Sequence, residues 1–411
     1  MKKKSTMKTT NKIQAFLMFL LFLIFSFPLL SQDLKLSTAQ KAAMDFLENQ
    51  EKRSAEMLVE IGGIISPSGM EMKRAEKVAD YMKAIGLSHV EVDQLPNAIG
   101  VIPGKTDNVL VFISTLDDLE TVALHQKASG NAPVIEGDKV IGPGTNTSSI
   151  TVSMLLAAEA IVKSGQQPKH TLVFAAVAQE ETGLKGMHAI YEKYKDRSIG
   201  FVDILGDGRN ISYGAMGIHW YKVRAFGPAG HTLRGGLPNV NQAMAKAIDR
   251  IFQMDYKEDR TVVNVSIIES GKVFNHKPEE AWFSLDMRSL NNATLAEMES
   301  KVKEILSDVM EETKIEMKLE PYQITPGGQI PNVLQTPLVL RAQEVSRFLG
   351  FEPNMSNAGS SNMNIAIAGG TSAIGLGGER GGQRGFPDEW ASIPNMITAA
   401  KHVFLLGSYD W

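Results

Sequence analysis

Residues 171–183 read TLVFAAVAQEETG, an apolar run of eight residues followed by Gln179 and then by two glutamates. An uninterrupted apolar run of this length is typical of a strand buried on both faces of a sheet. Carboxylates are costly at the end of a buried strand, so Glu180 and Glu181 need a counter-charge, a proton or a ligand there. This stretch therefore predicts a covered sheet and marks the end of one strand as a candidate site.

The sequence around this stretch alternates strands with helices. Residues 109–114 (VLVFIS) form a second apolar run, and residues 150–163 are rich in Ala and Leu and predict a helix. Apolar spacing and end signals predict further helices at 38–60, 71–85 and 393–406, and further strands at 90–92, 98–102 and 373–376. The alternation predicts an α/β core whose parallel or mixed sheet is covered on both sides.

The middle of the chain has a different order. It reads as strand 218–226, helix 240–254, strands 261–268 and 281–287, helix 294–312 and strand 314–322. This β-α-β-β-α-β order is the ferredoxin-like split unit. We therefore expect a core domain of residues 33–213 and 327–411, with a lid of residues 214–326 inserted into it. Pro and Gly residues near 326–331 mark the return to the core.

The first 32 residues have the pattern of a bacterial-type secretory signal peptide. Five lysines precede the almost wholly apolar run 15–30, and the small residue Ser31 follows it. The run is short for a membrane span and contains Ser26 and Pro28, which favours cleavage over an uncleaved anchor. We expect a periplasmic or secreted protein whose formal charge changes from −4 to −9 when the five lysines are removed. No later segment is apolar and long enough to span a bilayer.

Composition limits the classes of function. The 411 residues are 43% hydrophobic and 21% charged, which is ordinary for a globular protein and enough for two domains. The net charge of −4 gives no reason to expect a nucleic-acid partner. The chain has no cysteine, so disulfides, lipidated cysteines and thiolate metal sites are excluded.

Acidic residues follow three of the predicted strands. Ligands gather at the carboxyl ends of the strands in open α/β sheets. Each acid alone has a simpler interpretation as a helix cap or a solvated loop residue. Together, like charges at one sheet edge imply a cation or a raised pKa. The three groups are Asp117, Asp118 and Glu120, then Glu180 and Glu181, then Asp207.

Seven stretches resemble, in order, the co-catalytic zinc peptidases of the aminoacylase, peptidase T and glutamate carboxypeptidase type. They are VFISTLDDLETV, IGPGTNTSSI, AQEETGLKG, ILGDG, GPAGHTLRGGLPNVNQA, LDMRS and GFPDEW, and they span nearly the whole chain after residue 32. The resemblance implies a three-layer zinc-exopeptidase core, with a mixed sheet between helices, and an inserted ferredoxin-like α+β lid. It also implies two zinc ions and hydrolysis of peptide or amide bonds.

The resemblance gives roles to individual residues. Glu180 takes the place of the general base that acts on metal-bound water. Glu181 and Asp207 take metal-ligand places, and Asp117 matches the aspartate that orients the first histidine ligand. In the lid, the matching residues are His231 for oxyanion stabilisation, Arg288 as a clamp for a substrate carboxylate and Asn241 as a further substrate-binding residue.

Three of the five ligand places carry other residues. Thr115 stands at the first histidine, Thr147 at the bridging aspartate and Gly385 at the last histidine. Threonine hydroxyls do not replace imidazole as zinc ligands at neutral pH. The sequence therefore predicts that the dinuclear zinc centre is lost or impaired. His125 is the one histidine that the pattern offers as a substitute ligand.

The stretch GGERGGQRG (377–385) brings two arginines beside the lost ligand place at 385. We expect Arg380 or Arg384 to neutralise the acidic cluster in place of zinc. Two simpler interpretations compete with a functional one. Glu180 and Glu181 could cap the helix after them, and residues 141–149 could form an anion-binding turn with Thr145, Thr147 and Ser148 as donors.

Three functions stay open at this point. The chain could be an exported, non-catalytic protein that binds small peptides or N-acyl amino acids. It could be an active exopeptidase or amidohydrolase whose altered site holds one metal with Glu181, Asp207 and a borrowed histidine. It could also be an interaction module whose cleft is irrelevant. Members of the family often pair through the lid, so a homodimer is an expectation from resemblance alone.

Overall fold

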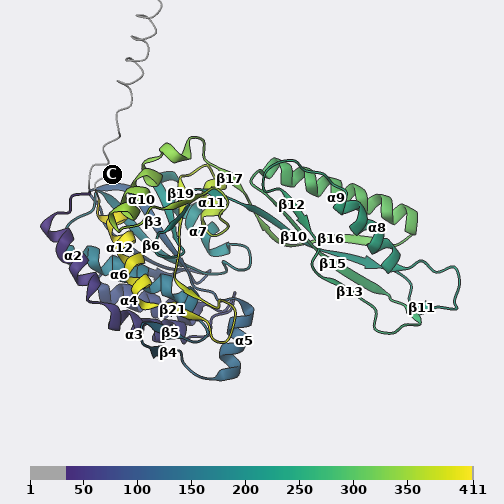
Figure 1. Cartoon of the computed structure of the whole chain (residues 1–411), viewed down its shortest axis with the longest axis horizontal. Helices are drawn as coiled ribbons and strands as arrows, with labels where there is room; N and C mark the ends of the chain where they lie inside the picture. Colours follow the sequence, from purple (N-terminus) through teal and green to yellow (C-terminus); the bar gives the residue numbers. More distant parts are fainter. Residues whose placement is uncertain (1–33, 410–411) are drawn as a thin grey trace, which may run out of the picture. The chain divides into compact units, whose positions relative to one another are not determined.

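The computed structural model describes residues 34–409, and the predicted signal peptide lies outside them (Figure 1). One compact unit begins at Leu36 and contains both the core and the lid. Within the described residues, no helix has the combination of length and hydropathy that a membrane span requires.

The core is built on a mixed sheet of eight strands. β3 lies in its centre and runs parallel to β6 and β7, and β19 runs parallel to β7. β2 and β8 run antiparallel to their neighbours β6 and β19. In spatial order the strands are β1 (Ser88–Val92), β2 (Ala98–Ile102), β6 (His170–Val177), β3 (Thr106–Thr115), β7 (Ser198–Ile204), β19 (Ala373–Gly377), β8 (Asn210–Ser212) and β18 (Asn354–Ser356).

Helices cover both faces of this sheet, which confirms the predicted three layers (Figure 1). On one face, Val111 and Ile113 of β3 pack with α7 (Lys185–Tyr194) and α11 (Met363–Ala368). On the other face, Phe112 packs beside α6 (Thr145–Ser164) and α12 (Ile393–Ser408), and it stacks on Phe174. Successive side chains of β3 therefore pack into the hydrophobic layers on opposite faces of the sheet.

Further helices complete the core. α2 (Thr38–Glu48), α3 (Glu51–Gly62) and α4 (Met72–Ile85) pack against α6, and α10 (Pro337–Phe348) packs against α12. The predicted helix 38–60 is in fact two helices, broken at Asn49 and Gln50. Residues 120–129, where His125 lies, form helix α5 (Glu120–Ser129), although the sequence left this segment between loop and strand.

The lid is a five-stranded antiparallel sheet with two helices on one face (Figure 1). Its chain order confirms the predicted β-α-β-β-α-β unit, except that the second strand is split into two short ones. The elements are β10 (Gly217–Phe226), α8 (Val240–Phe252), β12 (Val262–Asn264), β13 (Ile268–Ser270), β15 (Glu280–Ser289), α9 (Asn292–Thr313) and β16 (Glu316–Thr325).

Short elements complete the described chain. β4 (Val134–Glu136), β5 (Lys139–Ile141), β21 (Trp390–Ser392) and β20 (Gly381–Gly382) form a small sheet. Two further pairs of short strands are antiparallel. β11 (Gly230–His231) pairs with β14 (His276–Lys277), and β9 (Gly214–Ala215) pairs with β17 (Gly328–Gln329). The 3₁₀ helices are Lys195–Arg197 and Val333–Gln335.

Candidate binding site

Asp117 holds the loop that carries the glutamate pair. Its carboxylate is fully buried and accepts the backbone N–H groups of Glu180 (2.9 Å) and Glu181 (3.1 Å). It also accepts the hydroxyl of Ser68 at 2.6 Å. Burial raises the pKa of Asp117, and these three hydrogen bonds oppose that rise. Asp117 therefore orients backbone here, where the resemblance implied that it would orient a histidine.

Two more buried side chains fix the same loop. The amide oxygen of Asn97 accepts the N–H of Ala178 at 2.9 Å, and the carboxylate of Glu71 accepts the N–H of Gln179 at 3.0 Å. Both side chains have no exposed surface. Gln179 has φ of +55°, a left-handed conformation that is unfavourable for a residue with a Cβ. The sequence analysis missed both residues, because only the fold brings them to the loop.

Glu180 and Glu181 line a cavity of about 690 Å³ between the strand ends of the core and the base of the lid. The cavity is also bordered by Ser68, Trp220 and Arg288. Burial raises the pKa of Glu180 well above its usual value, and the neighbouring carboxylates Glu181 and Asp117 raise it further. The pKa of Glu181 rises less, because Arg384 opposes the effect of burial.

Arg384 forms an ion pair with Glu181, which confirms the expected contact between an arginine and the acidic cluster. The Arg384 side chain is 41% exposed and that of Glu181 is 20% exposed. Arg380 lies nearby, and burial together with the charge of Arg384 lowers its pKa to about 10. The acidic cluster thus has positive side chains around it that belong to the chain itself.

Asp207, the other retained ligand candidate, is also paired with an arginine. Its carboxylate is fully buried and lies 2.7 Å from Nε of Arg209. Its second oxygen accepts the backbone N–H groups of Arg209 and Glu379, both at 3.2 Å. Asp207 does not line the cavity. Among residues 34–409, no group of three or more His, Asp or Glu side chains is placed to hold a metal ion.

Thr115, at the first lost ligand place, belongs to a buried polar network. Its hydroxyl accepts the side-chain N–H of Asn362 at 3.2 Å, and the same amide group lies 3.4 Å from Asp203. Burial raises the pKa of Asp203 to about 6, against hydrogen bonds from Ser361 and Asn362. Sequence reasoning missed Asp203 and Asn362. The position of Asp203 inside a buried strand is the only signal that could have identified it.

The turn before α6 does bind an anion, but the anion is the side chain of Glu389. This buried carboxylate accepts the backbone N–H groups of Gly144 at 2.7 Å and of Gly385 at 3.1 Å. The predicted donor Thr145 instead gives its hydroxyl hydrogen to the carbonyl of Gly142. Thr147, at the second lost place, follows in the first turn of α6 and is 5% exposed. The helix N-terminus is therefore already neutralised from within.

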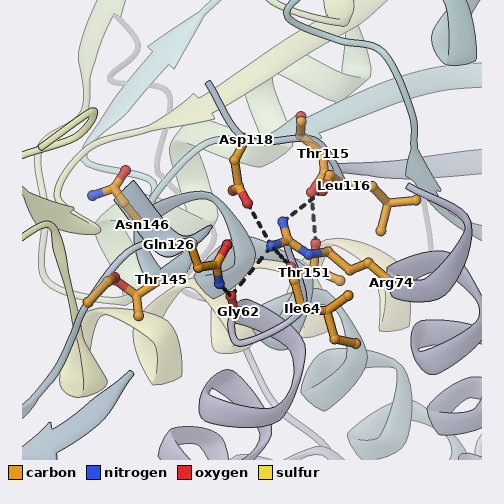
Figure 2. Close-up of polar contacts among 12 residues, drawn as sticks. Gly62, Ile64, Arg74, Thr115, Leu116, Asp118, Gln126, Thr145, Asn146 and Thr151 are labelled. Carbon is orange, nitrogen blue, oxygen red and sulfur yellow. Dashed lines mark hydrogen bonds and ion pairs between the residues drawn. The ribbon is translucent and has the colours of Figure 1, made fainter. Parts of the chain in front are cut away.

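Asp118 is engaged in structure. Figure 2 shows its carboxylate against the guanidinium of Arg74, with a distance of 2.6 Å between Nη2 and Oδ2. Both side chains are only 1% exposed. Arg74 also donates to the carbonyls of Leu116 and Ile64 (Figure 2). This pair ties α4 to the end of β3, so Asp118 is not free to hold a ligand.

The lid residues implied by the resemblance separate into two groups. Arg288 lines the cavity, where it pairs with Asp286 at 3.0 Å and lies over the ring of Trp220. His231 and Asn241 do not line it. His231 is exposed on β11, and the side chain of Asn241 accepts a hydrogen bond from Ser270.

The structure also bears on the helix-cap interpretation of Glu180 and Glu181 and on His125 as a substitute ligand. Helix α7 begins only at Lys185, after Leu184 in a left-handed conformation, and no acid lies in its first turn. The interpretation of Glu180 and Glu181 as caps of this helix is therefore wrong. His125 lies on α5 and does not line the cavity.

Comparison with known proteins shows which peptidases this chain resembles. The model of a peptidase dimerisation domain matches residues 213–314, and the model of peptidase family M28 matches residues 97–262. A succinyl-diaminopimelate desuccinylase of Corynebacterium glutamicum is 26% identical over 284 residues, which are 66% of this chain and 74% of that protein. A hippurate hydrolase of Campylobacter jejuni is 22% identical over 273 residues, which are 62% of this chain and 69% of that protein.

Solved structures agree on the fold. The aminopeptidase PepT of Bacillus cereus is 18% identical, with a TM-score of 0.72 over 87% of this chain and 98% of that one. A dinuclear metal binding peptidase of family M20 from Bacillus subtilis is 14% identical, with a TM-score of 0.64 over 88% of this chain and 98% of that one. The match to a peptidase dimerisation domain favours family M20 over family M28. The matched dimerisation domain and these relatives support a resemblance to the M20 family of peptidases.

Proposed function

We propose that this protein binds small peptides or N-acyl amino acids in the cavity beside Glu180, and that its dinuclear metal centre is lost or impaired. The observation that carries this proposal is the ion pair between Glu181 and Arg384, at the place where the family has a metal ligand. A bound cation there would have to displace a cation that the chain already supplies. The cavity offers Arg288 to a ligand carboxylate and Glu180 to an amine or amide N–H group.

The residues present do not fit two zinc ions. Thr115, Thr147 and Gly385 supply no imidazole or carboxylate, and Asp207 is held by Arg209. Structural and catalytic zinc sites in proteins use nitrogen, sulfur or carboxylate ligands, three or four per ion. We therefore assign no step of a reaction to a metal in this protein.

Metal content tests this proposal directly. The purified protein is incubated with zinc, and its metal is counted by elemental analysis with parallel calorimetry. We expect no more than weak binding. Two tightly bound equivalents per chain would overturn the proposal. The double variant Thr115→His, Thr147→Asp serves as a positive control, because it returns two ligands and should raise zinc affinity.

A second candidate is a working hydrolase with an altered site. The observation that favours it is that Glu180, with its raised pKa, and Arg288 line the same cavity. A carboxyl group with a raised pKa suits general acid or base chemistry near neutral pH. Release of amino acids from dipeptides and N-acyl amino acids, abolished in Glu180→Gln, would establish this function. If no peptide binds at all, the remaining candidate is a non-catalytic interaction module.

We also propose that the protein is exported and that two copies pair through the lid. Export rests on the charge and hydropathy of residues 1–32. Pairing rests on the match of residues 213–314 to a peptidase dimerisation domain. Cell fractionation and N-terminal sequencing of the native protein test the first statement, and sedimentation velocity tests the second.

A further inference from the structure

The lid has a second cavity, of about 390 Å³, on the face of its sheet that α8 and α9 leave uncovered. Its wall is largely aromatic and apolar. Trp220, Trp282 and Tyr322 contribute rings, and Ile267 adds an aliphatic side chain. Lys222 lies over the ring of Trp282, with Nζ 3.9 Å from the centroid.

The strand pattern explains this face. Alternate residues of β10 and β15 point to opposite sides of the sheet. Tyr221 and Phe283 are buried with the two helices, so Trp220 and Trp282 face the other way. A β-bulge in β16 at this level leaves Tyr322 as the extra residue, and Tyr322 is 77% exposed. Large aromatic groups thus stand on a surface that nothing in the lid covers.

The two cavities lie next to each other and share two lining residues. Trp220 and Tyr322 line both of them. The ion pair between Arg288 and Asp286 lies at the junction, since Arg288 lines the first cavity and Asp286 lines the second. A ligand with its polar end beside Glu180 and Arg288 can therefore extend along Trp220 towards Trp282 while it stays in contact with residues that line the two cavities.

We propose that this second cavity binds the distal aromatic or bulky apolar group of the ligand whose polar end lies beside Glu180. The inference rests on the proposed function and names its ligand class: peptides or N-acyl amino acids with an aromatic group. The first cavity alone already has the volume of a small-molecule site, so the extension adds room for a further large group. Aromatic rings in the ligand gain stacking contacts with Trp220 and Trp282 beyond their buried area.

Binding of four ligands tests the proposal: Ala-Ala-Ala, Phe-Ala-Ala, Ala-Ala-Phe and N-benzoylglycine, each by calorimetry. We expect at least one aromatic ligand to bind about three- to tenfold more tightly than Ala-Ala-Ala. Trp282→Ala should remove this preference and leave the affinity for Ala-Ala-Ala unchanged. Phe274→Ala, which removes a fully exposed aromatic ring elsewhere on the lid, should keep the preference.

The other outcomes are distinct. An aromatic preference that survives in Trp282→Ala and in Ile267→Ser, with both variants folded by their melting curves, overturns the inference alone. Failure of all four ligands to bind the native protein overturns the proposed function and the inference with it. If Trp282→Ala splits a dimer and leaves every peptide affinity unchanged, the face belongs to a second copy of the chain, and the inference is wrong.

Discussion

At the scale of single residues, the carboxylates in and near the site differ in whether an arginine pairs with them. Glu181 has Arg384, Asp207 has Arg209 and Asp118 has Arg74. Glu180 has no arginine partner in the described structure, and its neighbours are mainly acids. Glu180 is therefore the carboxyl group most open to a proton or to a ligand cation.

The first prediction concerns Arg384. Because Arg384 lowers the pKa of Glu181, Arg384→Ala should raise that pKa and decrease stability at pH 7. The pair is partly exposed, so the loss is at most about 1 kcal/mol, or roughly 1–2 °C in melting temperature for a chain of this length. The loss should shrink as the pH falls, because protonation of Glu181 removes the charge that Arg384 stabilises. Arg347→Ala, which removes the exposed pair with Glu352, is the matched control. Equal melting of both variants would count against a special role for Arg384.

The second prediction concerns Asp203. Its pKa rises from 3.8 in the unfolded chain to about 6 in the fold, so the folded state binds the proton more tightly. The stabilising contribution is complete below pH 3.8 and disappears as the pH rises through 6. Asp203→Asn should therefore flatten the decline of the urea midpoint between pH 4 and pH 6. Asp259→Asn, at an exposed position of the lid, should keep the native slope.

At the scale of elements, the loop after β6 is held by side chains from three other segments. Asn97 follows β1, Glu71 precedes α4 and Asp117 follows β3. Each supplies an acceptor to a backbone N–H group that has no strand partner. Such fixation keeps Gln179 in its left-handed conformation and presents Glu180 to the cavity.

The third prediction tests this fixation. Asn97→Ala leaves the N–H of Ala178 buried without its acceptor, which costs about 1–3 kcal/mol of unfolding free energy. Chemical denaturation measures the loss, and calorimetry with a bound peptide measures its effect on the cavity. We expect weaker peptide binding as well as lower stability. Asn131→Ala, on an exposed loop, should change neither quantity.

The predictable elements are those whose signal is local. The apolar runs at 109–114 and 171–178 gave buried strands because only a covered sheet accommodates them. Helix α5 was missed because its apolar residues have no clear helical spacing. The sequence predicted the start of α6 five residues too late, because the first turn of this helix is polar. The carboxylate that accepts the N–H group at its start belongs to Glu389, far away in the sequence. Arg74 and Glu71 act through contacts that no spacing encodes.

At the scale of the whole molecule, the first cavity is lined by residues of both the core and the lid, and the second, on the lid, shares Trp220 and Tyr322 with it. The resemblance identified the fold correctly, and three of the residues that it singled out, Glu180, Glu181 and Arg288, line the first cavity. The sequence offered Arg380 and Arg384 as counter-charges without deciding that Arg384 would pair with Glu181, and it did not reveal that His231 would lie outside the cavity. Those facts depend on how loops 227–239 and 377–385 fold, and their glycines leave many conformations open.

The fourth prediction concerns metal and global stability. A ligand at free concentration L that binds only the folded state stabilises it by RT ln(1 + L/Kd), and the melting temperature rises accordingly. We therefore expect the same melting temperature in excess zinc and in a chelator. The Thr115→His, Thr147→Asp variant should melt at a higher temperature in zinc than in the chelator. A rise for the native protein on adding zinc would contradict the ligand assignment.

The carboxylate of Glu389 has a consequence for synthesis. It completes the start of α6, a helix whose first donor lies 245 residues earlier in the chain. During translation, the central helix of the core must wait for nearly the whole polypeptide before its N-terminus is neutralised and α12 can pack beside it. A chain that stops before residue 389 lacks the hydrogen bond between Glu389 and the start of α6. Incomplete chains should therefore stay susceptible to proteolysis until the last segment has been made.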